Sequence, residues 1–277
     1  MLPFTPEQFL AVFASYNNAI WPIQIVAYFL GVLAVGLLFL NARQGDRAIS
    51  VILALMWLWT GIAYHGVSFS VINKVSYLFA GLFIVQGSFF LYAGVYRHQL
   101  SFGLQSDLAT GIGAAFIAYA AIVYPLIGMA IGHDYPEMPM FGVTPCPATI
   151  FTFGLLLTTI RPVPCWLLVI PVIWSLIGGS AAILLHVPQD WLLLVSGGIA
   201  VPLIVARDRH TIHDGGSQTA RSVHRRGPPR CGPPHPLDQH SSGPPCGKGR
   251  SPAQRLQARA KGSSSGRDDG IPGQLLL

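Results

Sequence analysis

The strongest constraint on the fold is a series of long apolar segments that contain no Asp, Glu, Lys or Arg. The first is WPIQIVAYFLGVLAVGLLFL, residues 21–40. A helix needs about 20 apolar residues to cross the roughly 30 Å hydrocarbon core of a bilayer. The other segments of this kind cover residues 48–67, 77–96, 109–131, 145–160, 163–185 and 191–206. They leave no amphipathic helices to shield them from water. The sequence therefore predicts an all-α, polytopic transmembrane helix bundle of about seven spans.

Charge divides the chain near residue 206. Residues 1–206 hold five Lys and Arg residues against six acids, whereas residues 207–277 hold twelve against five. The basic balance thus belongs to the C-terminal segment, and the apolar part has no basic face for a nucleic acid. We expect residues 1–206 to form a transmembrane helical domain whose partner is the lipid bilayer. Residues 207–277 are rich in Pro, Gly, Ser and Arg without apolar periodicity, so we expect a disordered basic tail.

The loop charges predict an orientation. Cytoplasmic loops are enriched in Lys and Arg. Six basic residues fall on one side of the expected spans and only Lys74 on the other. The six are Arg43, Arg47, Arg97, Arg161, Arg207 and Arg209. We therefore expect a multi-pass protein of the bacterial inner membrane, with its N-terminus outside and its C-terminus in the cytoplasm.

A short helix over residues 5–16 precedes the first span. Thr5 can cap it, Pro6 suits its first position, and Gln8 completes a T-x-x-Q capping box. Its apolar residues share one face, so we expect this helix to lie flat on the outer membrane surface.

Three stretches carry a resemblance to a known family. They are WTGIAYHGVSFSVINKVSYLFAGLFIVQG, AIGHDYPEMPMFGVTPCPATIFTFGLLL and RPVPCWLLVIPVIWSLIGGSAAILL. Residues 1–206 resemble bacterial integral-membrane proteins grouped only as a domain of unknown function, some loosely labelled permease. The resemblance implies a membrane location and no catalytic residue. Residues 207–277 depart from it, and a shifted reading frame or a wrongly predicted gene end is our hypothesis for that change.

The stretch FGVTPCPATIFTF places Cys146 between two prolines. In one interpretation, Thr144 caps a helix, Pro145 takes its first position and Pro147 falls in the first turn, where no N–H is needed. Cys146 is then a small apolar filler. We favour this interpretation.

The alternative is a soft-metal site on the outer face. A helix N-terminus favours the thiolate form of Cys146, and Cys, Met and His together suit cations such as Cu(I). His133, Met138 and Met140 precede Cys146, and His65 near the end of the second span maps to the same face. These five residues are the candidate metal ligands, and a soft metal ion is the one cofactor that the sequence suggests. No catalytic or organic cofactor-binding residue is predicted.

Three classes of function remain open. Many spans, prolines within helices and a polar outer face favour a permease for a small solute or cation. A non-catalytic membrane assembly or stress-related subunit is the second possibility. A membrane enzyme is the third, and without H-E-x-x-H or G-x-S-x-G it would have to use Cys146 or His65. The sequence leaves homo-oligomerisation open.

The orientation can be tested with reporter fusions. Fusions after Asn41, Arg97 and Arg207 should report the cytoplasm, and a fusion near Asp134 should report the exterior. An exterior signal after Arg97 would overturn the predicted topology.

Overall fold

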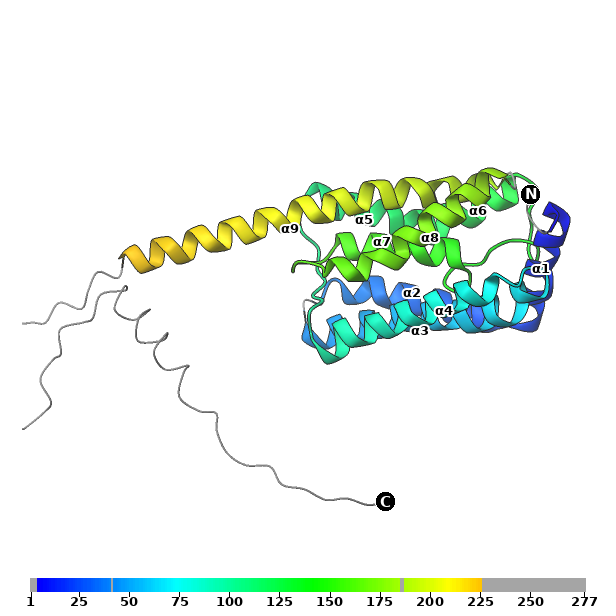
Figure 1. The fold of residues 1–277 in the computed structure, drawn as a ribbon, viewed down its shortest axis with the longest axis horizontal. Helices are drawn as coiled ribbons and strands as arrows, with labels where there is room; N and C mark the ends of the chain where they lie inside the picture. The colour runs from blue at the N-terminus through cyan, green and yellow to red at the C-terminus, as the bar shows by residue number, and fades with distance from the viewer. Residues whose placement is uncertain (1–3, 41, 185–186, 226–277) are drawn as a thin grey trace, which may run out of the picture. The chain divides into compact units, whose positions relative to one another are not determined.

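The chain folds into a bundle of helices (Figure 1). The computed structural model describes residues 4–40, 42–184 and 187–225, with residues 210–225 as helix backbone only. Within these residues the secondary structure is helical apart from one isolated bridge between Phe102 and Thr159. The predicted all-α class is confirmed. Residues 226–277, most of the segment expected to be a disordered tail, lie outside the described residues.

The first two helices form a bent pair. Pro6–Ala19 (α1) begins with the expected capping box, since the Thr5 hydroxyl accepts from the Gln8 N–H and the Gln8 side chain accepts from the Thr5 N–H. Ile23–Leu37 (α2) follows at an angle of 86°. Figure 1 shows α1 lying across one end of the bundle. Its arrangement is consistent with the expected surface helix, which stays a prediction.

Longer helices make up the rest of the bundle, and several combine α-helix with short π- or 3-10-helical parts. In chain order they are Arg43–Trp59 (α3) with Thr60–Ser68 (η1) and Phe69–Val71 (η2); Ser76–Phe90 (α4) with Leu91–Tyr96 (η3); Leu108–Ala118 (α5) with Tyr119–Val123 (η4) and Tyr124–Ala130 (α6); Pro145–Leu157 (α7); Cys165–Leu184 (α8); Pro188–Asp190 (η5); and Trp191–Arg225 (α9).

Among the described residues, five helices are long and apolar enough to cross a membrane, or six if α1 and α2 count as one span. Seven spans were expected. One difference lies in residues 145–160, where α7 has only 13 residues and ends at Leu157. After Leu157 the chain leaves the helix to pair with the segment around Phe102, through the Phe102–Thr159 bridge and the Gly103 N–H, which donates to the Thr158 carbonyl at 3.0 Å. The other lies in residues 21–40, where α2 has 15 residues and is long enough only together with α1.

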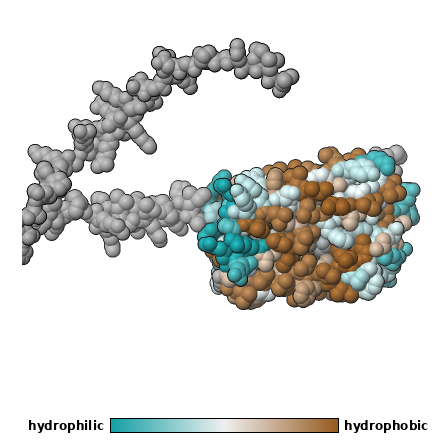
Figure 2. Space-filling view, turned by 90° about the horizontal axis from the view of Figure 1, so that it is seen from below, coloured by the Kyte–Doolittle hydropathy of each residue, from teal (hydrophilic) through white to brown (hydrophobic). Residues whose placement is uncertain are grey.

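The sides of the bundle are apolar. Large hydrophobic side chains are exposed along α2, for example Phe29 at 65% and Val32 at 70%. Figure 2 shows a broad hydrophobic band between two hydrophilic ends on the face in view. Exposed apolar surface of this extent marks contact with a lipid bilayer rather than with water. The protein is therefore a multi-pass membrane protein.

The short helix α7 occupies the middle of the bundle, between the group of α2, α3 and α4 and the group of α5, α8 and α9 (Figure 1). Almost all of its side chains are buried. The Trp57 indole donates to the Thr152 hydroxyl at 2.9 Å and ties α3 to α7. A Cβ added at Gly113 of α5 would lie 2.6 Å from the Gly154 carbonyl oxygen. This glycine pair lets the two helix backbones touch.

The last helix continues beyond residue 206, the expected end of the final span. Arg207 donates to the Leu157 carbonyl at 3.1 Å and to the Thr159 hydroxyl at 2.8 Å. It also forms an ion pair with Asp208, whose other oxygen accepts from the Val163 N–H at 2.8 Å. Because Arg207 satisfies the end of α7 and Asp208 the loop before α8, both residues belong to the packed part of the chain rather than to a tail.

The glycine contact gives a stability prediction with a matched control on the same helix. Gly113→Ala should lower the free energy of unfolding by about 1–3 kcal/mol, because the new methyl group meets backbone that cannot rotate away. Gly111→Ala should be neutral or slightly stabilising, since nothing lies within 4 Å of its added Cβ and Ala favours helix. Thermal unfolding of both variants in detergent measures the difference. Equal effects would show that α5 and α7 do not touch at Gly113.

Candidate functional site

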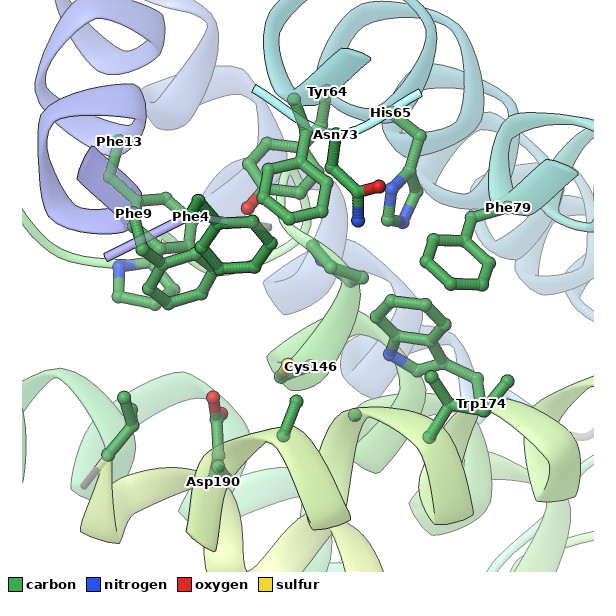
Figure 3. A pocket seen from close by; sticks show the side chains of 18 residues that line it. Phe4, Phe9, Phe13, Tyr64, His65, Asn73, Phe79, Cys146, Trp174 and Asp190 are labelled. Carbon is green, nitrogen blue, oxygen red and sulfur yellow. The ribbon is translucent and has the colours of Figure 1, made fainter. Parts of the chain in front are cut away.

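A cavity of about 150 Å³ lies at the end of the bundle that α1 crosses (Figure 3). Aromatic residues form a large part of its wall, and their rings come from the segment before α1 and from α1, η1, η2, α4 and α8. They are Phe4, Phe9, Phe13, Tyr64, Phe69, Phe79 and Trp174. Phe4 and Phe9 also pack on Ala182 and Val187, so the N-terminal residues cover one side of the cavity. Pockets for drug-sized ligands have volumes of roughly 300–1,000 Å³, so only a smaller molecule fits here.

Asp190 brings the one carboxyl group to the cavity lining, and the lining contains no Lys or Arg. Asp190 is 4% exposed, and its carboxyl group accepts a hydrogen bond from the Tyr124 hydroxyl. Among the described residues no cation lies within ion-pair distance of Asp190. A buried carboxylate without a cation is costly, and at membrane depth it is a functional candidate by default.

The Asp190 turn is held in place by its neighbours. Asp190 ends the 3-10 turn η5, and its N–H donates to the Val187 carbonyl at 3.1 Å. Tyr119 of η4 donates to the Gln189 carbonyl at 2.8 Å, one residue before it. With Tyr124, two tyrosines from one broken helix thus fix the position of the carboxyl group.

His65 offers a hydrogen-bond acceptor from the opposite wall. The Ser76 hydroxyl donates its proton to the His65 carbonyl at 2.7 Å. The Ser76 oxygen can therefore only accept from the His65 ring nitrogen Nδ1, which lies 3.3 Å away. The imidazole proton is therefore on Nδ1, and Nε2 carries the lone pair. That Nε2 is fully buried and has no hydrogen-bond partner within the described residues.

Trp174 offers an unused donor. Its side chain is 7% exposed, and its ring packs edge-on against His65 with 5.0 Å between centroids. In the part of the chain that the structure describes, the indole Nε1 has no nitrogen or oxygen partner, and the nearby polar group is the Cys146 thiol. Figure 3 shows the indole nitrogen on the side of the ring that faces Cys146. Since buried polar groups nearly always find partners, His65 and Trp174 both indicate a bound molecule or water.

Cys146 lies where the favoured interpretation of the sequence puts it. It is in the first turn of α7, after Thr144 in extended conformation, and it both packs against the core and lines the cavity. The expected cap differs in detail, because the Thr144 hydroxyl donates to the Met140 carbonyl at 2.7 Å. Pro145 and Pro147 offer no N–H in the first turn, so Cys146 is left as the one donor that a cap at Thr144 could use.

The five candidate metal ligands separate into two groups. His65 and Cys146 line the cavity, whereas His133, Met138 and Met140 do not. Met138 is buried, and its carbonyl accepts from Asn17 at 2.8 Å. Within the described residues no three His, Cys, Asp or Glu side chains gather as a metal site would require. The soft-metal set therefore stays a prediction from the sequence.

Sequence reasoning missed the two groups that most define the cavity, Asp190 and Trp174. The charge pattern by itself does not single out Asp190 among the six acids of residues 1–206. A sharper signal was available, because Asp190 stands directly before an apolar span with no basic residue nearby. Nothing in the sequence separates Trp174 from other membrane tryptophans.

The chain belongs to the family of unknown function DUF6064, whose pattern matches residues 6–214. The match runs from α1 to residue 214 in α9 and includes every residue of the cavity except Phe4. No curated protein and no solved structure matches the chain.

The Tyr124–Asp190 contact can be tested by a double-mutant cycle. Tyr124→Phe should cost about 1–3 kcal/mol of unfolding free energy, because a buried charged acceptor loses its donor. In an Asp190→Asn background the same change should cost less, since the acceptor is uncharged. Unfolding of the four proteins measures the coupling, and Tyr77→Phe at an exposed tyrosine is the control. Equal costs in both backgrounds would mean that Asp190 is not ionised.

Proposed function

We propose that this member of the DUF6064 family is a permease for a small protonated amine, which it binds in the aromatic cavity. The observation that carries the proposal is the buried Asp190 carboxyl group in a lining without Lys or Arg. A ligand with one positive charge would supply the missing counter-ion.

The aromatic wall supports a cation over a neutral solute. Rings of Phe, Tyr and Trp attract cations through their negative faces, by about 2 kcal/mol or more in desolvated sites. In this cavity the rings come from several helices and line the same space as the carboxyl group. An anion would face both the carboxylate and the ring faces, and would be repelled by each.

The unpartnered polar atoms of the cavity favour, among cationic ligands, an amine that has N–H groups. His65 Nε2 and the Asp190 carboxylate are acceptors, so they match N–H donors of an ammonium group. The Trp174 N–H is a donor and matches a hydroxyl or carbonyl oxygen on the same ligand. Ethanolamine has both features, whereas a quaternary ammonium ion has no N–H donor.

Broken helices support transport rather than binding alone. His65 lies in the π-helical part η1, and Tyr119 lies in the π-helical part η4. Pro171 and Pro202 lie inside α8 and α9. Such irregular points are where helices bend, and transporters use them around a central site. Between the cavity and the other end of the bundle, the buried side chains of α7 block the passage of a ligand. Transport therefore requires α7 to move against its neighbours.

A binding experiment tests the ligand class. The protein in detergent is heated with methylammonium, ethanolamine, tetramethylammonium or sodium chloride. We expect the first two to raise the melting temperature. Asp190→Asn should weaken binding by about 30-fold or more, because losing one member of a buried charged pair costs about 2 kcal/mol or more. Asp107→Asn, the same change at an acid outside the cavity, should leave binding intact.

An uptake experiment tests the permease itself. Protein in liposomes should accumulate labelled ethanolamine down its gradient, and the Asp190→Asn protein should not. Binding without uptake would contradict the permease and favour a non-catalytic membrane subunit. A response to none of the amines would contradict the ligand class.

A further inference from the structure

A second pocket lies at the opposite end of the bundle, where α3 begins and η3 ends. Its volume is about 220 Å³. Basic side chains from three separate segments gather in its wall: Arg43 and Arg47 from the start of α3, His98 from the loop after η3, and Arg161 from the loop after α7. The other lining residues are Asp46, Gly94, Leu100 and Ser101.

The positive charge of this pocket is not balanced from within. Asp46 is the one acid in the lining, and its Oδ1 accepts from the Phe102 N–H at 2.7 Å. Among the described residues no ion pair joins Asp46 to an arginine. The described contacts give Arg43 neither a hydrogen bond nor an ion pair. Three guanidinium groups therefore face one carboxylate that is already engaged with backbone.

Two of the arginines are oriented by the same residue. Arg47 lies 3.0 Å from His98 Nε2, and because guanidinium can only donate, this nitrogen accepts. The His98 carbonyl accepts from Arg161 at 3.5 Å. Each guanidinium group uses one N–H in these contacts and keeps others for a ligand. Arg forks of this kind match the oxygens of a phosphoryl group.

The loop that carries His98 is fixed rather than loosely attached. His98 has a left-handed backbone with φ of 51°, a conformation uncommon outside glycine. The chain beyond it pairs with the segment before Arg161, through the Phe102–Thr159 bridge and the Ile160 N–H donating to Ser101 at 2.8 Å. Strained backbone held by its surroundings is a feature of binding sites.

We propose that this pocket binds a phosphoryl group with a net negative charge. Two sources have this chemistry, the headgroup of an anionic phospholipid and a soluble phosphate. The lipid is favoured by position, since the arginines lie at the end of an apolar bundle, and basic pockets between spans bind such headgroups. The proposal does not depend on the amine cavity at the other end.

Lipid and phosphate are separated by two arms of one experiment. In the first, the protein is placed in nanodiscs of phosphatidylcholine with or without phosphatidylglycerol, and retained lipid is counted by native mass spectrometry. In the second, inorganic phosphate is added to the phosphatidylcholine nanodiscs, and the melting temperature is recorded. Retention of phosphatidylglycerol identifies a lipid site, and stabilisation by phosphate alone identifies a soluble ligand.

Variants connect the result to the pocket. Arg47→Gln and Arg161→Gln should each weaken binding by at least about 10-fold, the size expected for hydrogen bonds to charged groups. Arg43→Gln should act in the same direction without disturbing folding, since Arg43 is exposed. Arg97→Gln removes the same charge at the same end but outside the lining, and should retain binding. Equal losses in all four variants would reduce the site to general surface charge, and no binding in either arm would overturn it.

Discussion

The helix α7 is surrounded by protein on all sides, and the structure at both ends of the bundle depends on this burial. Inside a bilayer every backbone group must find a partner within the protein. The first turn of α7 meets this demand with Pro145 and Pro147, which have no N–H to satisfy. The last turn meets it with Arg207, which reaches the Leu157 carbonyl from α9. The helix can therefore begin and end inside the protein.

Both pockets follow from the shortness of α7. At one end Pro145 and Cys146 form part of the cavity wall, and the space above them is enclosed by aromatic rings and covered by α1. At the other end the chain turns at Thr158 and pairs with residues near Phe102, which brings Arg161 beside Arg47. A helix that crossed the whole bilayer would fill the first space and carry Arg161 away from the second.

Sequence reasoning predicted the elements that depend on local chemistry. The capping box at Thr5 and the helix start at Pro145 are set by neighbouring residues, and both are confirmed. It did not predict the end of α7, because Thr158 and Thr159 are apolar enough to continue a span and the pairing with Phe102 that follows the helix involves a segment distant in sequence. Nor did it separate Asp190 from other acids, since burial comes from helices distant in sequence. His65 and Cys146 were predicted to share a face, and they share one cavity.

The two ends carry charges that the described residues do not neutralise. Asp190 accepts a hydrogen bond from the Tyr124 hydroxyl but has no cation as a partner in the described part of the chain. Among the same residues, the arginines around His98 have one carboxylate nearby, that of Asp46, which already accepts from the Phe102 N–H. Selection for stability alone would favour an amide at Asp190, which keeps the hydrogen bond from Tyr124 without the cost of a buried charge. It would also favour fewer converging arginines. Unneutralised charges that lower the stability of the fold are expected where a bound ligand of opposite charge neutralises them. A cation at the aromatic end and an anion at the arginine end satisfy both, so the argument for two separate binding sites rests on the same electrostatic principle.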